Sequence, residues 1–246
     1  MKKQTKIILF ILIPLLVLTT LFIYKKNKEK DFDKFLLVEE VNKEESGEVK
    51  YQEQISSLQK EYNNEDIVGI LEIENTNYKV PIVQGNDNSF YLKHLPNKEY
   101  SIMGSIFLDY RVNINASRKL LIFGHNSSVY EMPFKILENY YDIDYINNHR
   151  YVYVKTKENI RKYEIFSLYI AINDYKYMNV NFNEETYQEH VKYLKEKSMY
   201  EINTEMSNSD NILILQTCST HKDYVKYKKK YLVVAFHEIN VNENVK

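Results

Sequence analysis

Short apolar runs separated by polar turn residues make up most of the chain after residue 66. Asparagine-rich turns such as 75–77 and 86–88 separate several of these runs. Short apolar runs bounded by turn formers are typical of β-strands, and many short strands at this spacing indicate a barrel or a sandwich. We therefore expect a mainly β domain over residues 65–246. The predicted strands are 67–73, 79–83, 105–108, 120–124, 151–156, 162–172, 212–218 and 231–239.

Helical periodicity interrupts this pattern twice. A short apolar stretch at 133–139 predicts one helix. A second stretch, 184–197, follows Asn183, a residue type favoured at helix N-caps, and its apolar residues recur on one face. Those residues are Tyr187, Val191 and Leu194. The sequence therefore predicts added helices, one of them before the strand at 212–218.

The N-terminus carries an uncharged run at 7–24 that is flanked by lysines on both sides. Such a run is long enough to cross a membrane as a helix. No A-x-A-like site occurs at 19–24, which favours an uncleaved signal anchor over a cleaved signal peptide. Residues 25–64 are rich in Glu and Lys, with apolar residues at the spacing of one or two amphipathic helices and a break near 46–47. We expect a cytoplasmic tail at 1–6, then the transmembrane anchor, then a helical linker.

Composition narrows the chemistry that the chain can perform. The formal net charge of the 246 residues is -1 and the lysine clusters are short, so we expect no nucleic-acid partner. Only five glycines are present, and none forms a phosphate-binding loop. One cysteine precludes an internal disulfide, and the histidines are scattered. We therefore expect neither a metal site nor a cofactor.

The single cysteine, Cys218, ends one of the predicted strands. Residues Ile212 to Leu215 are apolar on both faces, which indicates a strand buried in a sheet. Alternation places Gln216 and Cys218 on one face, where the strand runs into a polar turn. A lone cysteine is often an inert buried residue, whereas a nucleophilic thiolate needs a basic or cationic neighbour. At this point both interpretations of Cys218 are open.

His125 occupies the same kind of position as the cysteine. It directly follows the apolar run 120–124 and precedes the turn residues Asn126 and Ser127. The other five histidines lie in loops, in a predicted helix or in the last strand. Among them, His190 is expected on a solvated helix surface. A cysteine and a histidine at strand ends are a hint of thiol catalysis.

Four segments, in their order and spacing, resemble the class B sortases. They are VPIVQGNDNSFYLKH at 80–94, GSIFLDYR at 104–111, LLIFGHN at 120–126 and LILQTC at 213–218. The resemblance covers about residues 66–239. It implies a closed β-barrel of about eight strands, with N-terminal helices and a helix before the cysteine strand. It also implies a single-pass protein of the cell membrane whose catalytic domain, 65–246, is extracellular.

This resemblance implies the reaction of a cysteine transpeptidase. Cys218 would attack the carbonyl of a Thr in a C-terminal sorting signal and form a thioester. His125 would protonate the leaving amine. An amine of a peptidoglycan precursor or a pilin would then resolve the thioester. The implied partners are surface proteins that carry a sorting signal, this amine acceptor, and the membrane through the N-terminal helix.

One element of the family pattern is absent, namely the arginine on the strand after the cysteine. The chain has no arginine beyond Arg161. The resemblance places Lys230 at that position, or Tyr231 if the alignment slips by one residue. A lysine supplies a point charge but not the forked hydrogen bonding of arginine, so Lys230 would replace it imperfectly. The other interpretation is that Lys230 belongs to a solvated strand edge.

Further substrate contacts are implied for three residues. Asn88 and Leu92 match the asparagine and leucine that line the substrate groove in related class B enzymes, and Gln216 is the same-face neighbour of the cysteine. By residue type alone, Asn88 is a turn former and Leu92 a core residue. Asp109 and Arg111 are interpreted as a structural ion pair or a turn, and not as catalytic groups. Two other functions remain open: a sortase-shaped peptide-binding protein whose catalysis is impaired by the missing arginine, and a thiol peptidase.

Overall fold

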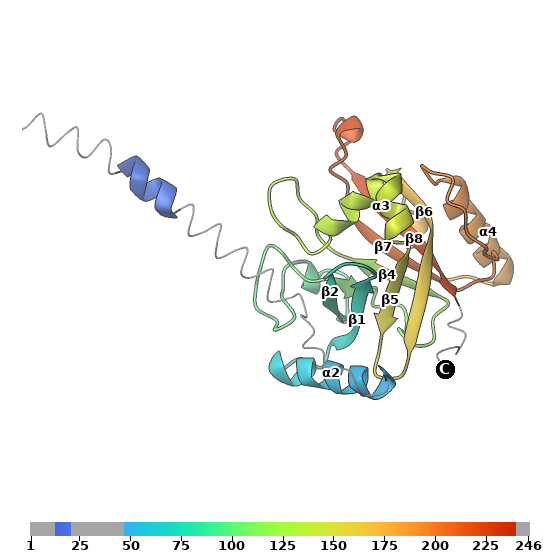
Figure 1. The fold of residues 1–246 in the computed structure, drawn as a ribbon, viewed down its shortest axis with the longest axis horizontal. Coiled ribbons are helices and arrows are strands. Elements are labelled where there is room, and N and C mark those ends of the chain that lie inside the picture. The colour runs from blue at the N-terminus through green and yellow to red at the C-terminus, as the bar shows by residue number, and fades with distance from the viewer. Residues whose placement is uncertain (1–12, 21–46, 240–246) are drawn as a thin grey trace, which may run out of the picture. The chain divides into compact units, whose positions relative to one another are not determined.

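The computed structural model describes residues 13–20 and 47–239, which belong to an N-terminal and a larger C-terminal unit (Figure 1). Of the predicted anchor at 7–24, only the helix at 13–20 is described. Among the described residues, no helix is long and apolar enough to cross a membrane. Within the described residues the predicted transmembrane helix therefore finds no support, and the predicted cell-membrane localisation is contradicted. The predicted tail at 1–6 and the linker segment 25–46 lie outside the described residues.

Eight strands close into one barrel, as the fold prediction expected. The order around the barrel is β1-β2-β3-β4-β7-β8-β6-β5. Closure gives each strand two hydrogen-bonded neighbours, so the sheet needs no exposed edge. The strands are β1 (Ile67–Ile73), β2 (Lys79–Val83), β3 (Phe107–Leu108), β4 (Lys119–Phe123), β5 (Tyr151–Lys155), β6 (Ile160–Ile172), β7 (Ile212–Cys218) and β8 (Lys230–Ile239).

The predicted strand at 105–108 is reduced to the two residues of β3. Its first part is held by an earlier segment instead, because Ser105 N donates to Tyr91 O at 2.9 Å. Gly104 has a φ of 58°, and a Cβ there would lie 2.6 Å from Leu92 O. Only glycine allows this close approach. The segment at 91–92, in the short helix η1 (Phe90–Leu92), is thereby fixed against the barrel.

Strand β7 lies between β4 and β8 and carries the apolar run found in the sequence. It pairs in parallel with β4 and antiparallel with β8. Ile212 to Leu215 have no exposed surface, as predicted for a strand buried on both faces. Cys218 is the one exposed residue of the strand. Strand β7 is therefore buried except at its last residue, where the reactive side chain of Cys218 lies at the surface.

The helices cover the barrel from different sides (Figure 1). Helix α4 (Glu184–Glu196) begins at Asn183, whose side chain accepts from Thr186 N in a capping box. Its predicted apolar face is buried, and Leu194 O accepts a hydrogen bond from Ser167 of β6 at 2.6 Å. Helix α2 (Gly47–Glu61) adds two further apolar residues to the same core. These are Ile55 and Leu58.

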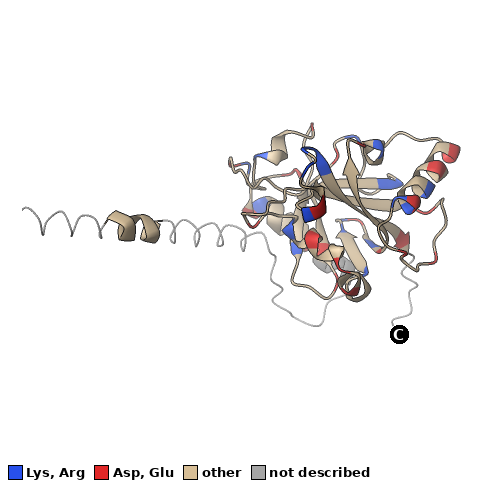
Figure 2. Cartoon of the chain, turned by 90° about the horizontal axis from the view of Figure 1, so that it is seen from above, with Lys and Arg blue, Asp and Glu red and all other residues tan. Residues whose placement is uncertain are grey.

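Shorter helical segments occupy the connections between strands. The helix predicted at 133–139 is a 3-10 helix, η2 (Lys135–Tyr141), followed by α3 (Ile143–Asn148), which the sequence did not predict. The other short helices are η3 (Lys176–Met178), between β6 and α4, and η4 (Lys222–Tyr224), between β7 and β8. Charged residues of both signs are spread over these surface elements (Figure 2).

Candidate active site

Parallel pairing of β4 and β7 brings His125 and Cys218 to neighbouring strand ends. Phe123 pairs with Gln216, and Gly124 N donates to Gln216 O at 3.2 Å. Parallel strands run in the same direction, so the residues that follow this pair on the two strands also lie next to each other. His125 and Cys218 occupy these positions, which joins two residues that are far apart in the sequence.

Two side chains tie these strand ends together. Thr217 Oγ1 donates to Gly124 O at 2.8 Å. Asn126 Nδ2 donates to Cys218 O at 3.0 Å and to the Glu138 carboxylate at 2.9 Å. Asn126 is largely buried, so this contact fixes the backbone of the cysteine. Sequence reasoning treated Asn126 only as a turn residue, although its place directly after the histidine was visible.

The ring of His125 is oriented by the backbone of Leu92. Its Nε2 lies 2.7 Å from Leu92 O. A carbonyl oxygen can only accept a hydrogen bond, so Nε2 carries a proton in both charge states of the ring. The Leu92 side chain packs against the hydrophobic core. Leu92 thus reaches the site through its carbonyl, and a contact of its side chain with substrate stays a prediction.

Two opposing effects act on the Cys218 thiol. Although the residue is exposed, surrounding protein atoms reduce the hydration of the sulfur, and this burial raises the pKa of the thiol. The ammonium of Lys230 acts in the opposite direction and lowers the pKa. Burial dominates, so the resting form near neutral pH is mainly the thiol.

The two predicted substitutes for the missing arginine both lie beside the cysteine. Tyr231 is the register partner of Cys218 across β7 and β8. Lys230, the first residue of β8, is half-buried, and its Nζ donates to Tyr227 O at 3.1 Å. Its backbone carbonyl accepts from Ser219 N at 3.0 Å. A cation is therefore positioned near the thiol, and its role toward substrate stays a prediction.

Aromatic side chains from η3 and the residue before it form a wall next to the cysteine. The ring centroids of Tyr175 and Tyr177 lie 6.0 and 6.5 Å from that of Tyr231. Tyr177 is almost completely buried, and burial raises the pKa of its hydroxyl. A negative charge on Cys218 would raise it further. The sequence did not predict this wall, because η3 is separated from the cysteine strand by the whole of α4.

The η3 wall is anchored by a buried lysine. Lys119 Nζ donates to Tyr177 O and Asn179 O, each at 2.6 Å, and lies 2.8 Å from His190 Nε2. Burial lowers the pKa of Lys119 well below its ordinary value. Burial and the nearby lysine also lower the pKa of His190 to about 3. The prediction that His190 is solvated is therefore wrong, because α4 turns this histidine inward onto the lysine.

Arg111 holds the next carbonyl of the η3 wall. Its Nη2 donates to Met178 O at 3.0 Å, between the carbonyls of Tyr177 and Asn179. Arg111 also forms two hydrogen bonds with the buried carboxylate of Asp109, at 2.8 and 2.6 Å. Burial alone would raise the pKa of Asp109, but these bonds and one from Asn88 lower it. The predicted structural ion pair is confirmed.

The Asn88 side chain forms hydrogen bonds within the protein, and Gln216 is largely buried. Asn88 Nδ2 donates to Asp109 at 3.0 Å, and its Oδ1 accepts from Tyr110 N at 3.1 Å. Gln216 is 9% exposed. Contacts of these two residues with substrate stay predictions. The residues that the structure brings together around the thiol are therefore His125, Lys230, Tyr231 and the tyrosines of the η3 wall.

Comparisons with known proteins match this arrangement. The family model of the sortase domain matches residues 71–238. Sortase B of Listeria monocytogenes is 36% identical over 74% of this chain and 72% of its own. The Staphylococcus aureus sortase B–substrate complex superposes with a TM-score of 0.68 at 27% identity, over 78% of this chain and 87% of that chain. A sortase B complexed with triglycine also gives 0.68, at 28% identity, over 77% and 87% of the two chains.

The chain therefore belongs to the sortase family, whose members are cysteine transpeptidases of cell-wall anchoring. Its curated relatives and its structural neighbours are sortase B proteins, which places it in class B.

Proposed function

We infer that this class B sortase cuts a C-terminal sorting signal after Thr and joins the protein to a cell-wall amine, with Cys218 as nucleophile and His125 as general acid. One observation carries this assignment. The only cysteine of the chain stands exposed at the end of a buried strand, beside a histidine whose ring is held by a backbone carbonyl. A nucleophile and a proton donor at adjoining strand ends satisfy the minimum requirement for thiol acyl transfer.

In the first step the Cys218 thiolate attacks the Thr carbonyl carbon and forms a C–S bond. His125 then gives its proton to the departing amine as the scissile C–N bond breaks, which leaves a thioester. An amine leaving group needs this proton, and imidazolium is the side chain best suited to supply it near neutral pH. The raised pKa of the thiol means that only part of the enzyme holds the reactive ion pair at one time.

Negative charge develops on the carbonyl oxygen during the attack. The ammonium of Lys230 is close enough to lower the pKa of the Cys218 thiol, and we assign it to stabilising this oxyanion. A lysine offers one charge without the fork of an arginine. Lys230 is therefore a functional but weaker substitute for the arginine of the family.

In the second step a neutral amine attacks the thioester carbon, transfers its extra proton to His125, and displaces the Cys218 thiolate. This regenerates the starting ion pair. Solved neighbours support the two substrates, since one is a sortase B–substrate complex and another is a sortase B complexed with triglycine. A peptide donor and an amine acceptor are the partners that this chemistry requires.

Mass spectrometry of the full chain tests the assignment. We would incubate the protein with a panel of sorting-signal peptides, with and without triglycine as the amine acceptor. The expected result is an acyl adduct on Cys218 without triglycine and a product joined to triglycine when it is present. The Cys218→Ala protein is the control and should give neither. Cleavage after Thr that persists in this variant would show that another group is the nucleophile.

A second candidate function is peptide capture with impaired turnover. The absence of any arginine after Arg161 and the raised pKa of the thiol favour it. Peptide binding without an adduct, or an adduct that triglycine never resolves, would support capture. In that case Lys230→Arg should restore turnover. A hydrolysed product that forms at the same rate with and without triglycine would instead indicate a thiol peptidase.

A further inference from the structure

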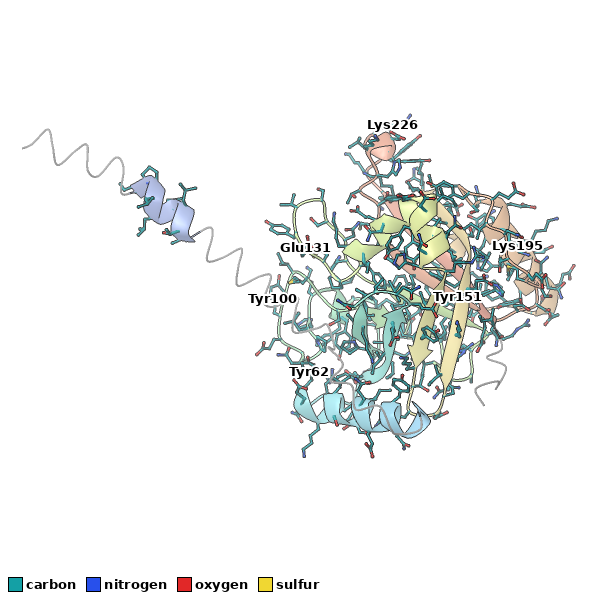
Figure 3. All side chains as sticks on the ribbon, viewed as in Figure 1. Tyr62, Tyr100, Glu131, Tyr151, Lys195 and Lys226 are labelled. Carbon is teal, nitrogen blue, oxygen red and sulfur yellow. The ribbon has the colours of Figure 1, made fainter. Side chains whose placement is uncertain are left out.

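The loop between β7 and β8, residues 219–229, forms part of the rim of the active site. It begins directly after Cys218 and returns at Lys230, and the hydrogen bond from Ser219 N to Lys230 O closes its base at 3.0 Å. The loop contains η4 and projects from the end of the barrel (Figure 1). Lys226 lies at its outer tip (Figure 3). Any ligand bound to Cys218 therefore lies next to this loop.

The loop carries a concentrated positive charge. Together with Lys230, the first residue of β8, the loop contains five lysines and one aspartate, a formal charge of +4, whereas the whole chain has a net charge of -1. Four of the lysines are exposed, and in the described part of the chain none of the four forms an ion pair. They are Lys222, Lys226, Lys228 and Lys229. Elsewhere on the surface some lysines do have an ion-pair partner, such as Lys192 with Glu196 on α4.

Aromatic packing gives the loop a defined shape. The ring of His221 lies edge-on to Tyr141 and Tyr224, with centroids 4.7 and 5.4 Å apart, and Tyr224 lies 6.4 Å from Tyr227. Tyr141 and Ser219 share a hydrogen bond of 2.8 Å between their hydroxyls. The lysines therefore project from a backbone that is held in place beside the thiol.

A group of like charges without partners is unfavourable in the free protein and attracts a ligand of opposite charge. We propose that the lysines of the 219–229 loop bind acidic residues of the substrate polypeptide next to the sorting motif. This proposal rests on the proposed function and names the class of substrate within it: proteins whose sorting motif is flanked by Asp or Glu. The occupant is the substrate itself, because the loop starts directly after Cys218, which holds the acyl group, and returns at Lys230, next to the register partner of that cysteine.

Lysine ammonium groups act as point charges on flexible stems. They therefore recognise the acidic character of a flanking segment without requiring one particular residue at one position. Electrostatic recognition of this kind weakens as salt screens the charges. A preference for acidic flanks should accordingly fall with ionic strength, whereas recognition of the sorting motif itself should not.

The test measures peptide binding to the full-length Cys218→Ala protein, which cannot turn over. Two labelled peptides share one sorting motif and differ in flanks of Asp and Glu or of Asn and Gln. Fluorescence anisotropy gives both dissociation constants at low and high salt. We expect about tenfold tighter binding of the acidic peptide at low ionic strength, as several exposed charge pairs of modest strength would give. This preference should fall below about twofold near 1 M salt.

Two sets of lysine substitutions locate the preference. The loop variant changes Lys222, Lys226, Lys228 and Lys229 to Gln. The matched control removes the same number of charges from other exposed lysines, by changing Lys60, Lys157, Lys192 and Lys197 to Gln. The loop variant should bind both peptides equally, and the control should keep the preference of the parent protein.

Three outcomes would overturn the proposal. These are equal binding of the two peptides by the parent protein, a preference that survives in the loop variant, or a preference that the control set also removes. If the protein sediments with vesicles of anionic lipid but binds the two peptides equally, the loop is a membrane contact and not a substrate contact. Because binding is measured without turnover, failure of the proposed chemistry would appear separately, as the absence of an acyl adduct when the protein with Cys218 intact is incubated with either peptide.

Discussion

Charged groups form ion pairs where β7 begins, whereas the exposed lysines where it ends form none among the described residues. Near Ile212, the carboxylates of Asp210 and Glu164 lie 3.3 and 3.5 Å from the ring nitrogens of the buried His237, whose lowered pKa keeps the ring mainly neutral near pH 7. At the same end, Arg161 forms two hydrogen bonds with Glu238, at 2.9 and 2.7 Å. At the other end the thiol is exposed, and the loop that follows it carries four exposed lysines without ion pairs among the described residues.

The charged groups near the start of β7 interact with one another within the fold, whereas those near its end are available to a ligand. A buried ion pair contributes little net stability, but removing one partner is costly because the other remains buried and unpaired. An exposed charge without a partner costs less in the fold and is free to act on a ligand. Substitutions at the two ends of β7 should therefore affect different properties, and five predictions test that separation.

The largest effect is expected at the reactive end. Cys218→Ala should reduce acyl transfer by on the order of 10³-fold or more, since the reaction loses its nucleophile. The melting temperature should stay within a few degrees, because the residue is exposed at a strand end. Peptide cleavage assays and thermal melts of the same preparation measure both quantities. A large fall in melting temperature would mean that this end is structural as well.

The opposite behaviour is expected from Arg161→Met. This change leaves the half-buried Glu238 carboxylate without its ion-pair partner and should lower the free energy of unfolding by about 3–5 kcal/mol. Urea unfolding measures the loss. The control Arg118→Met removes a more exposed arginine and should have a much smaller effect. Arg118 is also ion-paired, with Glu184, so equal losses in the two variants would show that burial does not set the cost of losing an ion-pair partner.

Asn126→Ala should weaken the link between β4 and β7 at the site. We expect kcat to fall by about tenfold with little change in KM, because the Cys218 backbone loses the hydrogen bond that holds it. Stability should fall by only about 1–2 kcal/mol. Steady-state kinetics and urea unfolding provide the readouts, with the exposed Asn147→Ala as control. A fall in stability without a fall in kcat would make Asn126 purely structural.

The pH dependence of stability should report on His237. Burial lowers the pKa of this histidine, although Asp210 and Glu164 oppose the shift. As the pH falls through about 6.5, the unfolded chain takes up a proton that the folded chain does not, so stability falls with the pH. His237→Gln should reduce this slope by at most about 1.4 kcal/mol per pH unit. Unfolding at pH 7 and pH 5 tests this, with His94→Gln as control. Identical slopes in the parent and His237→Gln proteins would contradict it.

The smallest effect is expected from Lys230→Met. Its ammonium lowers the pKa of the Cys218 thiol, so its removal should raise that pKa and leave less thiolate at a given pH. Alkylation of Cys218 by iodoacetamide at pH 8 should become roughly threefold slower. Lys230→Arg should keep the parent rate, and Lys229→Met should change it less. An unchanged rate in Lys230→Met would show that this lysine does not act on the thiol.

The strands of the barrel were largely predictable because buried strands consist of short runs of apolar residues, which are visible in the sequence. The apolar run Ile212 to Leu215 predicted β7 with its observed bounds, and the spacing of apolar residues with Asn183 predicted α4. Local pattern failed where contacts between distant segments decided the backbone. Only half of the run at 105–108 is a strand, because Ser105 bonds to Tyr91 and not to a neighbouring strand.

The candidate site was predictable only in part. Strand-end position and the family motifs singled out His125 and Cys218. Asn126 and the tyrosines of the η3 wall were missed, because their roles depend on the register between β4 and β7 and on the return of a remote segment to the cysteine. Register is defined only by the pairing of two strands, so the sequence of one segment does not reveal it.

By itself, the sequence determined which segments are buried strands and which residues carry reactive groups, because both depend on local pattern and residue type. Only the tertiary structure decided how each charge is used. Lys119 and Lys230 are the same residue type at the first position of β4 and β8. The carbonyls of Tyr177 and Asn179 close over Lys119 and bury it, whereas Lys230 stays half-buried beside Cys218. Their difference arises because electrostatic interactions depend on distance and solvent access in space, and the order of residues fixes neither.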